Sequence, residues 1–217
     1  MESEARSQPD AFAPSAARAL DAAARALLPV LLHRVNNSTQ VLVGVDELLR
    51  IGRASEFSPD LARISSDVHE VGWLFGVLAA GLGADTLVER VERDGLASVA
   101  RWATLAVRRT ERELEWTGAV GLQLIAPPRL APRAAFALAF ACVRAAECVQ
   151  PGVSLRAEVA RRDGRWELVL SARLDDDAAA WLSAFEGTEL ARTPNATTWR
   201  VPAAWFAARE PNAGAES

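Results

Sequence analysis

Apolar residues recur with a period of seven in the N-terminal part of the chain, and this repeat constrains the fold more than any other sequence feature. Residues 16–53 are rich in Ala, Leu and Arg, as expected of a helix. The apolar seam of this segment consists of Leu28, Leu31, Val35, Leu42, Val45 and Leu49. Such spacing predicts a helix with a single apolar stripe. Pro29 predicts a kink or a division within it.

A second segment repeats the pattern. Ser58 is placed to cap a helix, Pro59 fits its first turn, and Asp60 suits the positive end of the helix dipole. The seam of this helix consists of Leu61, Ile64, Val68, Val71, Phe75 and Leu78. Gly81 and Gly83 are predicted to end it.

Two antiparallel helices of this kind cannot bury both stripes against each other alone. The pattern therefore predicts a homodimer in which two hairpins form a four-helix bundle. In the alternative arrangement, the seams pack on the C-terminal half of the same chain.

The C-terminal half has a different sequence pattern, in which helical and strand-like segments alternate. Helices are expected at 96–107 and 133–149, with a short strand at 113–117 between them. Apolar and polar residues then alternate over 153–159 and 166–174, and the Asp163-Gly164 pair between these runs predicts a hairpin turn. A short helix capped within 175–177 and a last strand at 197–201 follow. The predicted fold class is α+β, a helical hairpin followed by a small α/β sandwich with helices on one face of a mixed sheet.

The composition removes several chemistries. All 24 basic side chains are Arg, because the sequence of 217 residues contains no Lys; Tyr is absent too, and there are two His and two Cys. Schiff-base and P-loop lysine chemistry are therefore excluded. A net charge of -4 gives no reason to expect nucleic acid as a partner. The longest stretch without charge, 71–84, is too short to span a bilayer, so we expect a soluble cytoplasmic protein.

Reactive polar residues concentrate on the first helix, in the run from His33 to Ser38. At 100° per residue, His33 lies about 140–160° from the seam and is predicted to face solvent. Polar or small residues share its side of the helix: Asn36, Asn37, Gln40, Gly44 and Glu47. An exposed His one turn before an amide is suited to act as a nucleophile toward a phosphoryl group. The alternative is an ordinary surface His with Asn neighbours.

The segment His33-Arg34-Val35-Asn36-Asn37-Ser38 resembles the phosphoacceptor box of bacterial sensor histidine kinases. The layout of nearly the whole chain is similar to that family, with a dimerising helical hairpin before a domain like the kinase ATP-binding module. The resemblance implies that His33 is the phosphorylated histidine and that Asn37 supports removal of phosphate from the partner. We expect four regions in the chain: a disordered N-terminus at 1–14, the hairpin at 15–87, the kinase-like sandwich at 88–209 and a tail at 210–217.

The nucleotide-binding motifs of that family are missing. Arg144 stands where the family has its magnesium-holding Asn, and the run 173–177 has no glycine where Asp-x-Gly-x-Gly is expected. The interval 181–199 is too short for an ATP lid and its following helix. Arg34 replaces the acidic residue after the histidine, and Ser38 replaces the proline. We therefore expect no ATP-dependent kinase activity and no cofactor bound by this chain.

A chain that has the helical hairpin of this family but lacks its nucleotide-binding motifs is similar to the dimeric histidine phosphotransferases of phosphorelays. That resemblance implies phosphoryl transfer through His33 between aspartates of response-regulator receiver domains, which supply the magnesium. Arg34 would offset the phosphoryl charge, and Asn36, Gln40 and Glu47 would contact the receiver. An inactive kinase-like module that only binds a response regulator or a kinase is the alternative, and a divergent active kinase is a third reading. His69, next to Val68, is expected to be a partly buried histidine at the bundle edge.

Overall fold

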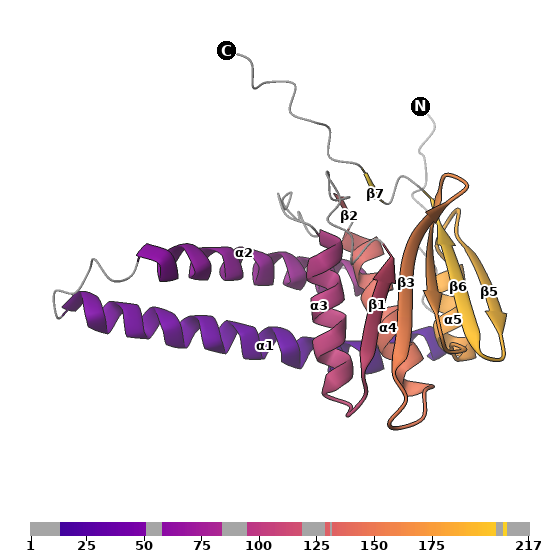
Figure 1. Cartoon of the computed structure of the whole chain (residues 1–217), viewed down its shortest axis with the longest axis horizontal. Coiled ribbons are helices and arrows are strands. Elements are labelled where there is room, and N and C mark those ends of the chain that lie inside the picture. The colour runs from indigo at the N-terminus through magenta and orange to yellow at the C-terminus, as the bar shows by residue number, and fades with distance from the viewer. Residues whose placement is uncertain are drawn as a thin grey trace, which may run out of the picture.

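The computed structural model describes residues 14–50, 58–83, 95–118, 129–130, 132–202 and 206–207. Two long helices, α1 (Pro14–Arg50) and α2 (Ser58–Gly81), form an antiparallel hairpin that projects from an α/β body (Figure 1). The body contains α3 (Gly95–Arg108), β1 (Leu114–Gly118), β2 (Arg129–Leu130), α4 (Pro132–Glu147), β3 (Leu155–Arg162), β4 (Arg165–Leu170), α5 (Asp176–Ser183), β5 (Glu189–Thr193), β6 (Ala196–Val201) and β7 (Phe206–Ala207). The predicted α+β class is confirmed.

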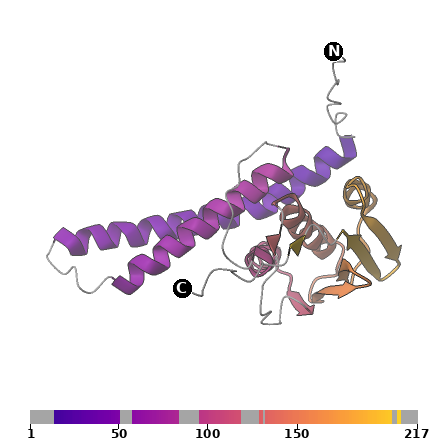
Figure 2. The same ribbon diagram turned by 90° about the horizontal axis from the view of Figure 1, so that it is seen from above.

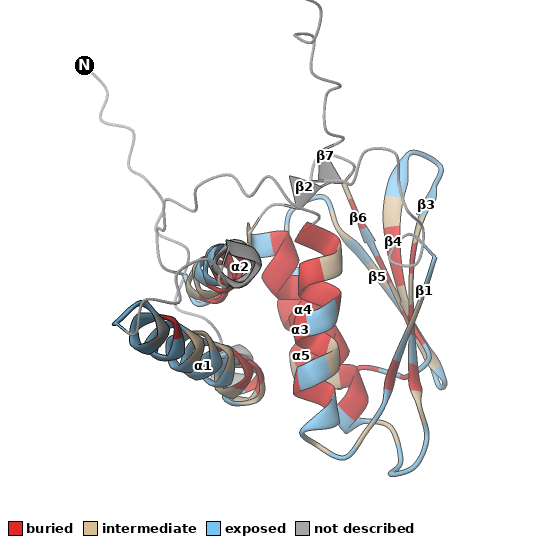
Figure 3. Ribbon diagram, turned by 60° about the vertical axis from the view of Figure 1, so that its left-hand side comes forward, coloured by how far each residue is buried: buried red, intermediate tan, exposed pale blue. Residues whose placement is uncertain are grey.

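The main sheet has the strand order β1-β3-β4-β6-β5, with β1 parallel to β3 and the other neighbours antiparallel. Its helices lie on one face, as predicted (Figure 3). Asp163 and Gly164 join β3 to β4 with φ angles of 50° and 76°, as a tight hairpin turn requires. Strand β5 and the short β2–β7 pair were not predicted from the sequence.

Helix α4 is the centre of the body. Twelve of its sixteen residues are buried, because α2 and α3 pack on one side of it and the sheet and α5 on the other. A helix that is apolar all round is stable only in such a place. Its Phe140 ring lies 4.4 Å, centroid to centroid, from Trp181 of α5, and Phe136 meets the same indole edge-on at 5.8 Å.

The first half of α1 belongs to the same core as the body. Leu27 and Leu31 are fully buried there with Leu74 and Val77 of α2. The indole nitrogen of Trp102 on α3 donates a hydrogen bond of 3.1 Å to the Leu27 carbonyl. Figure 2 shows α1 continuing past α2 alongside the body, and the helix is not divided at Pro29. The base of the hairpin is therefore fixed to the body by buried apolar contacts.

Gly81, the last residue of α2, allows this helix to approach α4 closely. A β-carbon at this position would lie 2.1 Å from the ring of Phe136, which is fully buried and has no room to move. Gly83, with a φ of 87°, takes the left-handed conformation expected just beyond a helix end. The predicted helix end is confirmed, and Gly81 has the additional role of a packing contact.

Beyond the body, the described side chains of the two helices share few apolar contacts. Val45 of α1 and Ile64 of α2 form a small cluster, packed by Val41. The other predicted seam residues of α1 that lie at intervals of seven are exposed: Leu28, Val35, Leu42 and Leu49. On α2, Val68 is exposed, Phe75 is partly buried, and Leu82 just beyond the helix is exposed. We call these seven residues the apolar stripe.

The two halves of the apolar stripe lie on the same side of the hairpin. Viewed along each helix from its N-terminus, the stripe residues are rotated by about 65–80° from the residues that contact the other helix, in the same sense on both helices. Because the two helices are antiparallel, this rotation brings both sets of stripe residues to the same side of the hairpin. That side faces away from α3, α4 and α5, and Figure 3 shows exposed residues on it. The described part of the chain therefore leaves a long apolar surface uncovered.

Candidate functional site

His33 lies on α1 two residues beyond the last residue of the helix that is buried in the shared core, Leu31. Its side chain is exposed, as predicted. The helical period places it about 140–180° from Leu28, Val35 and Leu42, on the opposite side of the helix from the apolar stripe. A protein that covers the stripe would therefore leave His33 accessible.

Asn37, one turn further along α1, contacts the imidazole directly. Its amide nitrogen lies 3.2 Å from Nε2 of His33. With the amide nitrogen as donor, Nε2 accepts, and this arrangement corresponds to the neutral tautomer of His33 that carries its proton on Nδ1. In that tautomer, the lone pair needed for nucleophilic attack is on Nε2, the ring nitrogen beside Asn37. The two site residues with the clearest predicted chemistry are thus in contact.

Arg34 points to α2 and is part of a charged cluster. Its guanidinium donates a hydrogen bond of 2.8 Å to Glu70, and Arg101 of α3 donates one of 2.7 Å to the other oxygen of the same carboxylate. Asp67 lies 3.8 Å from Arg34. The positive charge of Arg34 is therefore shared with α2 rather than left free for a phosphoryl group.

Glu70 is the buried member of that cluster, with 4% of its surface exposed. Burial by itself raises the pKa of this carboxyl group, but the hydrogen bonds from Arg34 and Arg101 outweigh that effect and lower the pKa from 4.5 to about 2. Glu70 is thus ionised at neutral pH and joins three helices. Sequence analysis missed both Glu70 and Arg101; the one available signal was an acid directly before seam residue Val71.

A groove lies between the hairpin helices beside His33. Its lining consists of Arg34, Asn37, Ser38, Val41, Ile64 and Asp67. The volume of about 190 Å³ accommodates several water molecules. The charged residues of this lining are Arg34 and Asp67, whose opposite charges balance each other.

The remaining predicted residues extend the His33 side of α1 toward the hairpin tip. Asn36, Gln40 and Glu47 are all exposed. His69 is also exposed, and its Nδ1 lies 2.6 Å from the Ser65 carbonyl of its own helix. The prediction that His69 is partly buried at the bundle edge is wrong, because α2 turns this residue away from both α1 and the body.

Arg144 and Asp175, at two of the positions where the sequence departs from the kinase motifs, form an ion pair with each other. Arg144 of α4 donates a hydrogen bond of 2.9 Å to Asp175, and a second one to Glu147. The other oxygen of Asp175 accepts from the Ala178 amide and caps α5. Both oxygens of Asp175 therefore already have protein donors.

Within the described ranges, no group of three or more His, Cys, Asp or Glu side chains is arranged to hold a metal ion. No described helix combines the length and apolar character needed to cross a bilayer.

Solved structures include some with a similar fold. No family model matches the chain, and no curated protein matches it. A solved structure described as a bacterial phosphotransferase aligns with 89% of this chain and 99% of its own, at 15% identity and a TM-score of 0.39. The function proposed for this chain rests on its own residues.

Proposed function

We propose that this chain is a histidine phosphotransferase of a two-component pathway and acts in the cytoplasm. His33 accepts a phosphoryl group from an aspartyl phosphate of one receiver domain and returns it to another. The observation that supports this most strongly is the exposed imidazole with Asn37 against its Nε2, on the side of α1 opposite the apolar stripe.

The proposed step follows from the tautomer that Asn37 selects. The Nε2 lone pair attacks phosphorus, an N–P bond forms, and the P–O bond to the aspartate breaks. The aspartate leaves as a carboxylate on the receiver, which also supplies the magnesium ion. The Asn37 amide has to move from Nε2 as phosphorus approaches, and is then placed to donate to a phosphoryl oxygen.

A second part of the proposal is a homodimer through the apolar stripe. The stripe is long, regularly spaced and uncovered in one chain, and a second copy supplies a matching surface by two-fold symmetry. The resulting four-helix bundle leaves one His33 accessible on each outer side.

Rigid attachment of the hairpin to the body favours a phosphotransferase over an active kinase. A kinase domain has to carry its bound ATP to the histidine, whereas here the base of α1 shares the core of the body and Glu70 ties α1 and α2 to α3. The Arg144–Asp175 pair supports the same conclusion, since it uses the aspartate that a nucleotide would need.

The test is phosphoryl transfer from radiolabelled receiver domains to the purified chain. Wild type is expected to be labelled reversibly, and His33→Ala is expected to lose all labelling with its melting temperature almost unchanged, because an exposed side chain contributes little to stability. His69→Ala serves as the matched control and is expected to transfer normally. Receiver binding without any label on His33 would replace this proposal with the interaction-module alternative.

A further inference from the structure

One exposed side of α3 is positively charged around an apolar residue. Arg101, Leu105 and Arg108 follow one another at intervals of four and three, so they lie along one side of the helix. Leu105 is 41% exposed. Helix α3 contains no acidic residue, and Arg108 makes no ion pair with any described residue. We call these three residues the α3 face, and its charge is opposite to the net charge of -4 of the whole chain.

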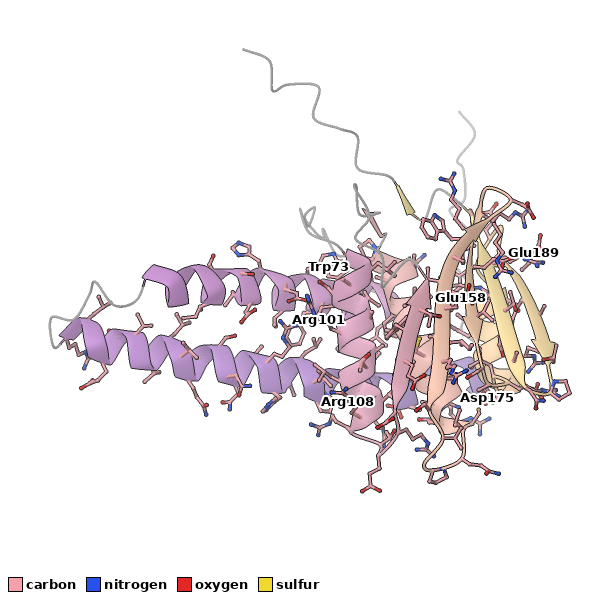
Figure 4. The ribbon with its side chains drawn as sticks, viewed as in Figure 1. Trp73, Arg101, Arg108, Glu158, Asp175 and Glu189 are labelled. Carbon is pink, nitrogen blue, oxygen red and sulfur yellow. The ribbon has the colours of Figure 1, made fainter. Side chains whose placement is uncertain are left out.

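The α3 face lies beside His33. Arg101 shares the Glu70 carboxylate with Arg34, the residue next to His33. Trp102 donates to the Leu27 carbonyl, so α3 crosses α1 just before the exposed part of that helix begins. Figure 4 shows Arg101 and Arg108 on α3 where it passes the two hairpin helices. A domain that reaches His33 therefore also reaches α3.

We propose that the α3 face is a second docking surface for the receiver domain, and this inference rests on the proposed function. It fits a receiver surface on which carboxylates flank an apolar side chain: the apolar group covers Leu105 while the carboxylates pair with Arg108 and with the exposed part of Arg101. Arg101 is 63% exposed although it is bonded to Glu70, so it has donors left for a partner. By the helical period, the apolar stripe faces away from α3, so a second copy of the chain bound to the stripe does not cover the α3 face.

The proposal assigns the two surfaces different tasks. Contacts around His33 are common to any receiver that exchanges phosphate, because they surround the reacting atoms. The α3 face contributes no reacting group, so it selects among receivers by charge and shape without entering the chemical step.

The experiment measures both binding and transfer with the full chain. Each purified receiver domain of the source genome is titrated calorimetrically against wild type, and the tightest binder is used, phosphorylated, in initial-rate assays. Leu105→Ala and Arg108→Glu are each expected to raise Kd and KM about tenfold and to leave kcat unchanged. A change of this size is typical when a side chain at the centre of an interface is removed. Arg161→Glu, the same charge reversal on an exposed position of β3 near the Asp163-Gly164 turn, is the control and is expected to match wild type.

The outcomes separate this inference from the proposed function. Transfer by both α3 variants with wild-type Kd and KM would overturn the inference and leave the phosphotransferase intact. Wild type that binds a receiver through the α3 face but never labels His33 would support the inference and refute the transfer function. Loss of the dimer by either variant in light scattering would show that a second copy occupies the face, and a wild type that binds no receiver would overturn the docking surface altogether.

Discussion

Replacement of Glu70 by Gln is expected to destabilise the protein in a way that depends on pH. Gln keeps the shape of the side chain but removes the charge that Arg34 and Arg101 both bind. Two guanidinium groups then lose their shared buried partner, and removal of one member of a buried ion cluster is strongly destabilising. The carboxylate is 4% exposed, so solvent screens it little.

The magnitude follows from the pKa. Folding lowers the pKa of Glu70 from 4.5 to about 2, and each unit corresponds to about 1.4 kcal/mol, so the ionised carboxylate contributes about 3 kcal/mol. Because the folded pKa is below the unfolded one, this contribution is complete above pH 4.5. It is lost as the pH falls toward 2, at about 1.4 kcal/mol per pH unit.

Urea unfolding followed by tryptophan fluorescence measures this contribution at pH 7, 5, 4 and 3.5. The gap in unfolding free energy between wild type and Glu70→Gln is expected to be about 3 kcal/mol at pH 7 and 5 and to narrow below pH 4.5. Glu158→Gln, which removes an exposed partner of Arg162, is the control and is expected to stay within about 0.5 kcal/mol of wild type. A gap under about 1 kcal/mol, or one that does not change with pH, would refute the assigned role of the cluster.

Three further predictions concern the stripe, the α2–α4 contact and the nucleotide position. Val35→Asp changes a residue of the exposed stripe and is expected to give folded monomers in light scattering. Ile64→Asp changes a residue buried between the helices and is expected to lower the unfolding free energy by about 3 kcal/mol or more. A monomeric wild type at micromolar concentration would contradict the dimer. Gly81→Ala is expected to cost at least about 1–3 kcal/mol in urea unfolding, because its methyl group meets Phe136, and wild-type stability would contradict that packing. Titration calorimetry with magnesium-ATP is expected to give no saturable heat in the micromolar range, and saturable binding would make a divergent kinase the better explanation.

Elements specified by neighbouring residues could be predicted from the sequence. The Asp163-Gly164 pair fixes its turn because both residues adopt positive φ. Asp175 caps α5 through the Ala178 amide, a contact made within three residues. Strand β5 escaped prediction because it is an edge strand: its residues are nearly all exposed, so it shows no alternation of apolar and polar side chains.

The Glu70 cluster could not be predicted because its members come from three helices. Arg34 and Glu70 are 36 residues apart in sequence, and Arg101 is 31 residues beyond Glu70. Periodicity identifies a face of one helix but does not say which other helix that face meets. For the same reason, the helical period predicted that His33 lies on the outside of α1. It did not predict that the neighbouring Arg34 shares Glu70 with Arg101 of α3.

Periodicity also identified the apolar stripe without showing what it contacts. The spacing of the stripe residues matters because the described part of one chain does not bury them. Residues exactly seven apart drift by about 20° per repeat on a straight helix, so a stripe such as Leu28, Val35, Leu42 and Leu49 meets a partner along its length only if the helices supercoil. Inside the chain, α2 instead contacts α1 through Arg34, Ser38, Val41 and Val45, which follow steps of four and three on another side. His33 lies on a third side. One helix thus separates an intramolecular contact, an apolar stripe and an exposed imidazole. The proposed dimer and the proposed receiver would therefore bind to different sides of it.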